Sequence, residues 1–392
     1  MTLVGLAAGY WGIPAAHGTE RQSEFTAVPF VGGDSDMGWG GGALASWARL
    51  SPGLEPYRLR VEAATALTVR RDGEDVELPY TDAYLLFEAP HALPHRLKLR
   101  ARLSYTRETR LKYYGLGNAA EPAGEPTLYG RTHPTLDVQA EYRVTEAVRV
   151  IWGVNYTQNW LKVAEDSQLG RDMVQGSTEV REILGRAKDH AVVSFSYGLT
   201  FDTRDDIVNP QTGVLAAARV DLAPGGSGAL VHRYARLNTS VRGFLTLMPN
   251  RLVLAARVVG DLLSDGAPFY ELGRYDQTSA IGGIQGVRGV PAQRYIGKLK
   301  VFGNLELRSH LFAARLFQKS TRFGLTGFVD TGRVWSDYQS HPELDGSAIG
   351  LKLGLGGGLR VSAGKSFVLR FDVGWAKEAE PIAAYLTSGH AF

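Results

Sequence analysis

The sequence lacks cysteine altogether, since none of its 392 residues is Cys. Disulfide frameworks and thiolate-ligated metal sites are therefore excluded. It also has no run of about 18 apolar residues, which excludes a membrane-spanning helix. A transmembrane β-barrel stays possible, because its strands alternate polar and apolar residues and never form a continuous apolar run. The formal net charge of +3 is small for this length and argues neither for nor against a nucleic-acid partner.

The common signatures of enzyme active sites are missing as well. There is no His-Glu-x-x-His or Gly-x-Ser-x-Gly motif, and the glycine-rich stretches lack the Lys-Ser/Thr of a phosphate-binding loop. The three carboxylates within 202–206 (DTRDD) fit a strand end and its turn better than a catalytic cluster. We therefore expect no catalytic residue, no metal site and no cofactor. A Ser/His enzyme on a barrel wall is an alternative that no particular residue supports.

Alternation of polar and apolar residues with a period of two is the strongest pattern in the chain. Apolar and aromatic residues take every second position in 97–105, 195–201 and 367–375, and the positions between them are mostly polar or glycine. With their flanks these segments alternate over about ten residues, whereas a strand of a soluble sandwich usually has about 5–6. A tilted strand needs about 9–11 residues to cross a bilayer, so the pattern favours a membrane barrel.

Turn signals divide the chain into sixteen strands. The predicted spans are 23–32, 37–50, 56–71, 76–89, 95–108, 132–144, 147–162, 190–203, 213–223, 230–244, 251–264, 296–310, 322–336, 348–362, 365–377 and 383–392. Brief turns alternate with connections that include long segments at about 109–131, 163–189, 265–295 and 337–347. We therefore predict an all-β fold, a 16-stranded antiparallel transmembrane β-barrel with long extracellular loops and short periplasmic turns. An even number of strands places both termini on the periplasmic side.

The chain divides into two parts. Residues 1–22 form a lead-in segment or a residual signal peptide, and residues 23–392 form the barrel. The first 18 residues are mostly apolar but lack the Lys or Arg of a standard signal peptide, so both possibilities stay open.

A ring of sixteen strands is wide enough for an aqueous lumen. By alternation the basic row at 96–102 points into this lumen, as do Arg370 and Asp372. If the lumen is an open pore, the basic row favours anions.

Several segments, in order and at suitable spacing, resemble the motifs of one family of membrane barrels. They are LTFDTRDDIVNPQTG (199–213), GVRGV (286–290), FGNLELR (302–308) and GFVDTGRVW (327–335), with YYGLGN (113–118) as a weaker similarity. From about residue 24 to 392 the chain resembles the BamA/TamA-type outer-membrane barrel superfamily, also called the bacterial surface antigen family. Two-partner secretion transporters and organellar protein-import barrels are relatives within it.

The resemblance implies a role for Arg288. In the family, the loop after the eleventh strand folds back into the lumen, where its arginine meets acidic residues of the inner wall. Alternation lets Glu306 and Asp330 point inward, and one guanidinium can hold two carboxylates. The predicted lumen-loop clamp comprises Gly286, Val287, Arg288, Gly289, Glu306 and Asp330. A latch that couples the loop to barrel opening is the alternative to a fixed clamp, and it requires a second conformational state.

Two further sets of residues follow from the resemblance. The family strand–turn motif comprises Asp202, Thr203, Arg204, Pro210 and Gly213. The predicted barrel seam, where the first and last strands meet, comprises Pro29 and Phe392. Pro29 lacks an amide donor and interrupts the ladder of the first strand, and Phe392 is the aromatic end that the family's assembly machinery reads. A poorly paired seam would suit a barrel that opens laterally.

The resemblance implies a barrel of the bacterial outer membrane that inserts or translocates other outer-membrane or secreted proteins, without a cofactor or a chemical reaction. Its implied partners are outer-membrane lipid, client proteins, and a periplasmic or surface subunit, with no nucleic acid. Relatives carry periplasmic POTRA domains before the barrel, whereas only about 22 residues precede it here. The alternative function is a pore or a structural barrel subunit of an envelope complex.

Overall fold

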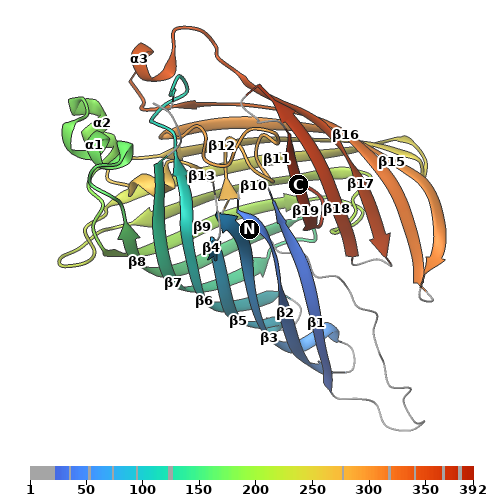
Figure 1. Cartoon of the computed structure of the whole chain (residues 1–392). Helices are drawn as coiled ribbons and strands as arrows, with labels where there is room; N and C mark the ends of the chain where they lie inside the picture. The colour runs from blue at the N-terminus through green and yellow to red at the C-terminus, as the bar shows by residue number, and fades with distance from the viewer. Residues whose placement is uncertain are drawn as a thin grey trace.

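The chain folds into a closed barrel in which neighbouring strands run antiparallel (Figure 1). The structure is a computed structural model, and it describes residues 23–392 except 35–36, 52–53, 73–74, 94–95, 122–126, 276–277, 317–318, 340, 364–366 and 378–381. The predicted lead-in segment, residues 1–22, lies outside the described residues. In the part of the chain described, no helix combines the length and the hydropathy needed to span a bilayer.

Sixteen strands form the wall, so the predicted 16-stranded antiparallel barrel is confirmed. The wall strands are β1 (Ser23–Asp34), β2 (Gly38–Ser51), β3 (Leu54–Asp72), β5 (Tyr80–Leu93), β6 (Leu97–Tyr113), β7 (Thr127–Arg143), β8 (Val148–Lys162), β9 (His190–Asp202), β10 (Gly213–Ala223), β11 (Tyr234–Met248), β12 (Leu252–Leu263), β15 (Leu299–Leu316), β16 (Lys319–Trp335), β17 (Lys352–Ala363), β18 (Phe367–Ala376) and β19 (Ala383–Ser388). The short β4 (Asp75–Glu77) pairs with the end of β3 and leads into β5, so it adds no separate wall strand.

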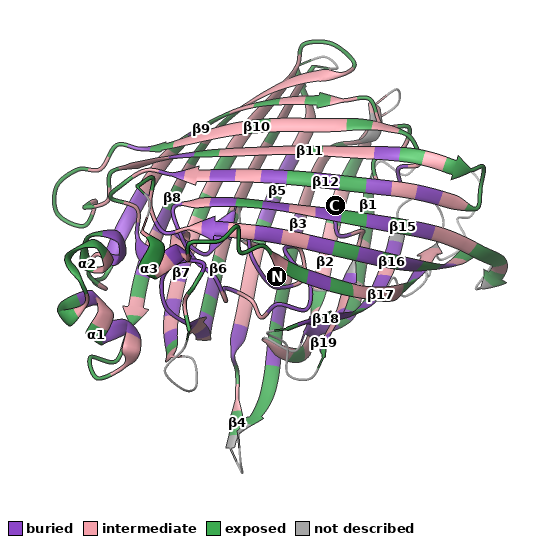
Figure 2. Ribbon diagram, turned by 90° about the horizontal axis from the view of Figure 1, so that it is seen from above, coloured by how far each residue is buried: buried purple, intermediate pink, exposed green. Residues whose placement is uncertain are grey.

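The alternation in the sequence becomes the two faces of this wall. On β15, Leu305 and Leu307 point outward and stay exposed, whereas Asn304, Glu306 and Arg308, which alternate with them, are buried. Figure 2 shows buried and exposed bands alternating along the strands in the same way. Because the outward positions are mostly Leu, Val, Phe, Tyr and Trp, the outer surface suits lipid rather than water.

The two rims of the barrel differ in the length of their connections. At the rim that we call the short-turn rim, strands are joined by segments such as 144–147, 203–212 and 249–251. At the opposite rim, the long-loop rim, the connections include 114–126, 163–189, 264–298 and 336–351. This is the alternation that the sequence predicts.

Several strand boundaries were predicted wrongly. β7 begins at Thr127 rather than at residue 132. β11 ends at Met248 rather than at residue 244, because the chain reverses only at Asn250, whose φ is 58°. β15 and β16 both extend past their predicted limits at the short-turn rim, because the pairing continues through a bulge after His310 as far as Leu316 and Lys319.

The loops of the long-loop rim pack into a cap with an apolar core of its own. The cap contains the helices α1 (Gln168–Gln175), α2 (Thr178–Leu184) and α3 (Pro342–Asp345), and the turn η1 (Phe269–Glu271). Its core residues come from three connections and their flanking strands, and Leu344 of a fourth connection packs against them: Leu111, Tyr113, Leu116, Tyr129, Leu169, Met173, Ile183, Leu184, Leu263, Phe269, Tyr270, Leu272 and Ile296. The cap therefore lies over the end of the lumen at this rim.

The segment YYGLGN joins this cap to distant parts of the chain. The Asn118 side-chain amide donates to the carbonyl of Gly350 at 2.8 Å, and the Ala119 amide donates to the carbonyl of Leu344 at 2.8 Å. Gly117 has a φ of 90°, and a Cβ there would lie 2.3 Å from the Leu344 carbonyl oxygen. Only glycine fits this close approach.

Candidate functional site

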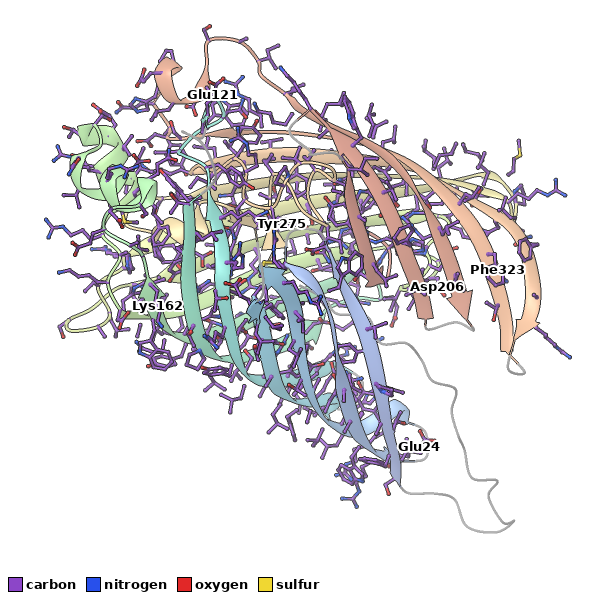
Figure 3. All side chains as sticks on the ribbon, viewed as in Figure 1. Glu24, Glu121, Lys162, Asp206, Tyr275 and Phe323 are labelled. Atoms are coloured by element: carbon purple, nitrogen blue, oxygen red, sulfur yellow. The ribbon has the colours of Figure 1, made fainter. Side chains whose placement is uncertain are left out.

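The loop between β12 and β15, residues 264–298, turns back into the lumen, so Tyr275 lies inside the barrel in Figure 3. Two short strands, β13 (Arg274–Tyr275) and β14 (Thr278–Ser279), pair within it. Farther along, Ile281 bridges to Tyr295 and the Gly283 amide donates to the Val290 carbonyl at 2.9 Å. The segment 281–295 is therefore a closed hairpin with Arg288 near its tip.

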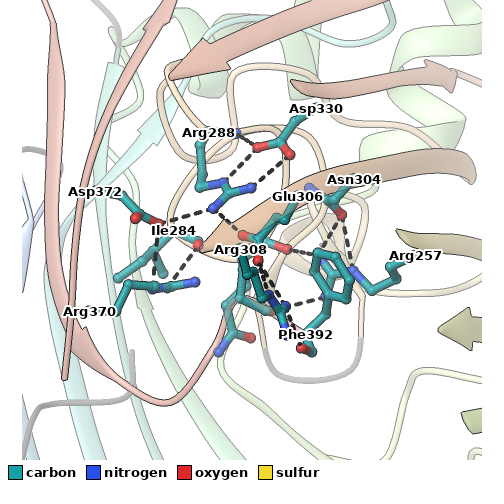
Figure 4. A network of polar contacts seen from close by, with 12 residues as sticks. Arg257, Ile284, Arg288, Asn304, Glu306, Arg308, Asp330, Arg370, Asp372 and Phe392 are labelled. Carbon is teal, nitrogen blue, oxygen red and sulfur yellow. Dashed lines mark hydrogen bonds and ion pairs between the residues drawn. The ribbon is translucent and has the colours of Figure 1, made fainter. Parts of the chain in front are cut away.

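Arg288 is fully buried and binds Asp330 of β16 through both edges of its fork. Its Nε donates to Oδ2 at 2.7 Å, its Nη2 donates to Oδ1 at 2.9 Å, and its main-chain amide donates to Oδ2 at 3.1 Å (Figure 4). Paired, parallel hydrogen bonds of this kind are the strong form of an arginine–carboxylate contact. The structure thus brings together Arg288 and Asp330, which the sequence assigned to one clamp.

Arg288 also binds two further carboxylates. Its Nη1 donates to Glu306 at 2.6 Å and to Asp372 of β18 at 3.0 Å, and its guanidinium lies 3.5 Å from the centre of the Phe328 ring. Burial alone lowers the pKa of Arg288, but the carboxylates, Asp330 most strongly, outweigh burial and raise that pKa above its usual value. The guanidinium therefore stays charged in a site without water contact.

Other arginines surround the same carboxylates. Arg308 donates to Glu306 at 2.8 Å, Arg360 forms an ion pair with Asp372, and Arg370 lies 3.5 Å from Asp372. Arg370 also donates to the carbonyl of Ile284 in the loop at 3.2 Å. Several arginines thus surround these carboxylates, and the contacts of this network hold the loop to several strands of the wall.

Glycines of the wall lie in direct contact with the loop tip. A Cβ on Gly354 would lie 2.0 Å from the Arg288 carbonyl oxygen, and one on Gly374 would lie 2.8 Å from the Gly289 amide. Gly289 has a φ of 94°, and its amide donates to the Tyr385 hydroxyl of β19 at 3.1 Å. The backbones of loop and wall therefore touch directly, which larger residues would prevent.

Apolar side chains of the loop complete the contact. Val287 and Val290 are both fully buried in a cluster with residues of the loop and of the wall: Val259, Tyr275, Ala280, Ile281, Tyr295, Phe302, Val334 and Ala376. Gly286 lies tightly against the same hairpin, since a Cβ there would meet the Ala280 carbonyl oxygen at 2.1 Å. All members of the predicted clamp are thus in one place.

A second polar network, which was not predicted from the sequence, holds the base of the loop. Arg236 of β11 donates to Asp261 at 2.7 Å and to Glu271 of the loop at 2.9 Å. Arg274 of the loop donates to Glu108 of β6 at 2.9 Å. Because β6 and β11 are far apart in the strand order, this network crosses the lumen.

The basic row of β6 is not a free cationic surface. Lys98 lies 2.6 Å from Glu88, and Arg102 lies 3.6 Å from Asp82, both on the neighbouring strand. Arg60 also binds Glu88, at 2.9 Å. Two of the four cationic side chains of the row, Lys98 and Arg102, are therefore compensated by carboxylates.

The strand–turn motif forms a closed turn of the short-turn rim. Asp202 accepts from Arg204 Nε at 2.8 Å and Nη2 at 2.9 Å, and the Thr203 amide donates to the carbonyl of Val214 at 2.9 Å. Pro210 is buried, and Gly213 takes a φ of 102° where a Cβ would meet the Thr203 carbonyl oxygen. The motif residues are thus explained by the geometry of the turn.

The remaining carboxylates of this turn bind backbone amides. Asp205 accepts from the amides of Gln211 and Thr212 at 2.9 and 3.1 Å, and Asp206 accepts from those of Val208 and Asn209 at 2.7 and 2.8 Å. Both side chains thus stabilise the backbone of the turn. Across the described residues, no group of three His, Cys, Asp or Glu side chains is placed to hold a metal ion.

The seam between β1 and β19 has little pairing. Only Gly33 with Leu386 and Asp34 with Tyr385 are in register, whereas β1 pairs with β2 at twelve positions from Ser23 to Asp34. Pro29 lies within the part of β1 that pairs with β2 alone, where the sequence expected a weak seam. In the described residues, the other edge of 23–32 thus has no strand beside it.

Phe392 does not lie at the seam, so this part of the prediction was wrong. β19 ends at Ser388 rather than at residue 392, and Gly389, with a φ of 78°, turns the chain away from the sheet. Phe392 is buried in the lumen against Phe244 and Ala255. Its main-chain oxygen accepts from Arg308 at 3.2 Å (Figure 4).

The sequence reasoning missed Asp372 as a partner of Arg288, although alternation placed it in the lumen. It also missed Arg257, which donates to Asn304 at 2.7 Å and to the Ala391 carbonyl at 3.3 Å. The sequence did contain a signal for these residues, because charged side chains occupy lumen-facing positions of the strands near the loop. The strand positions were visible in the sequence, but the pairing between strands far apart in the chain was not.

Comparison with known proteins identifies relatives of this barrel. The family model described as Omp85 superfamily domain matches residues 65–384. BamA from Haemophilus ducreyi lacking POTRA domains 1–3 has a TM-score of 0.61 and 16% identity, covering 94% of this chain and 70% of that chain. CdiB from Escherichia coli has a TM-score of 0.60 and 13% identity, with 94% and 63% covered. CdiB from Acinetobacter baumannii has a TM-score of 0.54 and 14% identity, with 93% and 59% covered.

These structural likenesses, at low identity, show the fold. The chain spans less than two thirds of either CdiB chain, and no curated protein matches its sequence. The resemblance to the BamA/TamA-type superfamily is confirmed, and a barrel of this kind is consistent with the bacterial outer membrane. Because the family match covers most of the chain, the protein belongs to the Omp85 superfamily.

Proposed function

We propose that this barrel inserts or translocates other outer-membrane or secreted proteins, and that clients enter through the seam between β1 and β19. The observation that carries the proposal is the pairing of two positions at the seam against twelve between β1 and β2. A free strand edge is a template to which another strand can add by main-chain hydrogen bonds. Residues 23–32 of β1 offer such an edge to a client strand.

The lumen supports the same function. The loop is held inside the barrel by Arg288 and by the network of Arg236 and Arg274, and the cap lies over one end. A route through the wall is thus less obstructed than a route along the axis. The alternative function, an open pore, gains less support from the basic row than the sequence suggests, because Lys98 and Arg102 are paired with carboxylates.

The orientation and partners belong to the same proposal. We place the short-turn rim and both termini on the periplasmic side of the bacterial outer membrane. Client proteins and a periplasmic or surface subunit are the expected partners besides lipid. The proposed role is non-enzymatic, and the carboxylates of the turn at 202–206 have a structural explanation, since they bind Arg204 and backbone amides.

A disulfide across the seam tests this proposal. Gly32→Cys with Thr387→Cys continues the observed register by one pair, and the cysteine-free chain forms no competing bond. The control is Ala27→Cys with Ala45→Cys, a pair in register between β1 and β2. The readout is the folding of a small, unfolded barrel client in proteoliposomes, followed by its heat-dependent gel shift.

The oxidised seam variant should block client folding, and reduction should restore it, while the oxidised control stays active. Undiminished activity of the oxidised seam variant would refute entry through the seam. Conductance that survives in both variants without any client folding would favour the pore instead.

A further inference from the structure

Arg131 of β7 differs from most other buried arginines of the barrel. Among the described residues, the buried arginines that form ion pairs with carboxylates are Arg236, Arg274, Arg288, Arg308, Arg360 and Arg370. Arg131 and Arg257 of β12 are also buried, but neither forms an ion pair with a residue that the structure describes. A buried charge without a partner is costly, so both residues require an explanation.

Arg257 is explained by neutral acceptors. Its guanidinium donates to the side-chain oxygens of Asn304 and Tyr275 and to the carbonyl oxygens of Gln285 and Ala391. Each of its three nitrogens takes part in these bonds, two of them with two acceptors each. The hydrogen-bonding capacity of this guanidinium is therefore fully used.

Arg131 lacks such a set of acceptors. Its Nε donates to the Asn159 side chain at 2.9 Å, and its guanidinium lies 3.7 Å from the centre of the Tyr270 ring of the loop. Its Nη1 is buried and has no hydrogen-bond partner among the described residues, and the whole residue is only 5% exposed. The positive charge of Arg131 therefore lies between the wall and the base of the loop without a carboxylate bound to it.

A polar cavity of about 80 Å³ lies beside Arg131 in the lumen. Hydroxyl and amide side chains of β7, β8 and β9 line it, with Thr135, Asn155 and Ser194 among them, and the loop contributes Tyr270. A cavity needs only about 10–15 Å³ to hold one water molecule. This cavity therefore has room for a small ion together with water.

The charges around the cavity do not cancel. The two carboxylates that line it are already paired, Asp221 with Arg219 at 2.8 Å and Glu271 with Arg236 at 2.9 Å. Apart from His133, the described groups in the cavity and in the ion pairs beside it are five cations, Arg131, Arg219, Arg236, Arg274 and Lys300, and four carboxylates, Glu108, Asp221, Asp261 and Glu271. One positive charge of this set is left over, and Arg131 is the member without an ion pair.

We infer that this cavity binds a small monovalent anion such as chloride beside Arg131. A single negative charge matches the one positive charge left over, and the hydroxyl and amide groups of the lining complete the shell of the ion. Because Arg131 also lies against the Tyr270 ring, the bound anion stabilises the contact between β7 and the base of the loop. Water is the competing occupant, but it would leave the charge uncompensated.

Crystals of the full chain grown with bromide in place of chloride locate the anion, because bromide scatters anomalously. We expect anomalous density in the cavity beside Arg131. Asn159→Asp puts a carboxylate of nearly the same shape at the group that already accepts from Arg131 Nε, so it should abolish this density. The matched control is Asn304→Asp, the same change beside Arg257, and it should retain the density.

Hydrogen exchange in solution measures the effect of the anion on the loop. Amides of 268–275 should exchange more slowly in chloride than in gluconate at equal ionic strength, because gluconate is too large for the cavity. A ligand that binds only the closed form slows exchange by local opening, so chloride at about ten times its Kd should slow it roughly tenfold. Asn159→Asp should be equally protected in both salts, whereas Asn304→Asp should keep the difference.

Two results would overturn the inference. Bromide density that persists unchanged in Asn159→Asp would mean an adventitious ion that the charge of Arg131 does not recruit. Equal exchange of 268–275 in the two salts in the parent would mean that the cavity holds water alone, or a halide at crystal concentration only. Unaltered heat-dependent gel shifts of the variants establish that they are folded in either case.

Discussion

The lumen loop and the seam show two ways in which parts of one barrel are joined. At the loop, Arg288 binds three carboxylates and an aromatic ring, all without exposure to solvent. At the seam, two neighbouring strands of the wall share only two positions in register. The wall thus has its fewest strand-to-strand pairs where the chain closes on itself. The strongest polar contacts instead hold a loop inside the barrel.

The two regions are also connected, because the loop contacts one strand of the seam. The loop contacts β15, β16 and β18 through Glu306, Asp330 and Asp372, and β19 through Tyr385. The side of the seam that belongs to β19 is therefore held by the loop.

Hydrogen exchange should show the largest difference between a strand at the seam and a strand within the wall. Amides of 23–32 that face away from β2 should exchange by local opening, whereas β16, paired on both sides, should exchange only with global unfolding. The difference between the free energies of opening at the two strands can approach the whole free energy of unfolding of a domain, about 5–15 kcal/mol. Mass spectrometry of deuterated peptides measures it, and equal protection of β1 and β16 would mean a closed seam.

Replacement of Arg288 by Ala should release the loop tip. Breaking one side of a buried ion pair costs roughly 3–5 kcal/mol, because the remaining charges stay buried without a partner. The measurement is maleimide labelling of Val290→Cys, a position with no exposure in the intact protein. Arg288→Lys keeps the charge but loses the paired hydrogen bonds of the guanidinium. Its labelling rate should therefore lie between those of the parent and of Arg288→Ala. Labelling that stays as slow as in the parent would show that the apolar contacts alone hold the loop.

A methyl group at Gly374 should weaken the same contact from the wall side. The added Cβ would lie 2.8 Å from the Gly289 amide, so the loop tip must shift, at a cost of about 1–3 kcal/mol. Gly327→Ala is the matched control, because nothing lies within 4 Å of a Cβ at that position of β16. The labelling assay at Val290→Cys should distinguish the two variants, and identical rates would argue against direct backbone contact.

Glu271→Gln should give the smallest effect, about 1 kcal/mol, because an amide still accepts a hydrogen bond from Arg236. Burial raises the pKa of Glu271, but Arg236, Arg131 and Arg274 outweigh burial and hold that pKa below its usual value of 4.5. The contribution of the charge is therefore complete above pH 4.5 and is lost as the pH falls through the lower, folded-state pKa. Proteolysis of the loop should rise in the parent below this pH and stay flat in Glu271→Gln.

The wall could be predicted from the sequence because each strand carries its own signal. The alternation around Leu305 and Leu307 determines which residues face lipid, and the same parity places Glu306, Asp330 and Asp372 in the lumen. Arg288 entered the prediction through the resemblance of its loop to a family motif rather than through the alternation.

The remainder depends on contacts between distant segments, which one sequence does not reveal. Arg274 and Glu108 are separated by 166 positions, and nothing near either residue indicates the other. The inward turn of the last residues follows from one glycine, Gly389, in a segment whose composition still suits a strand. The bulge after His310, which lengthens β15, likewise cannot be recognised from the alternation of polar and apolar residues in the sequence.

The cap has a consequence for the order of folding. Asn118 and Gly350 touch across 232 positions of the chain, and such distant contacts form late because a long loop must close first. The cap core cannot assemble until β6, β12 and the segment before β17 have all reached their places. A barrel that stalls before its last strands would therefore display Leu116, Leu344 and the apolar faces of α1 and α2 to proteases and chaperones, and only a finished molecule hides them.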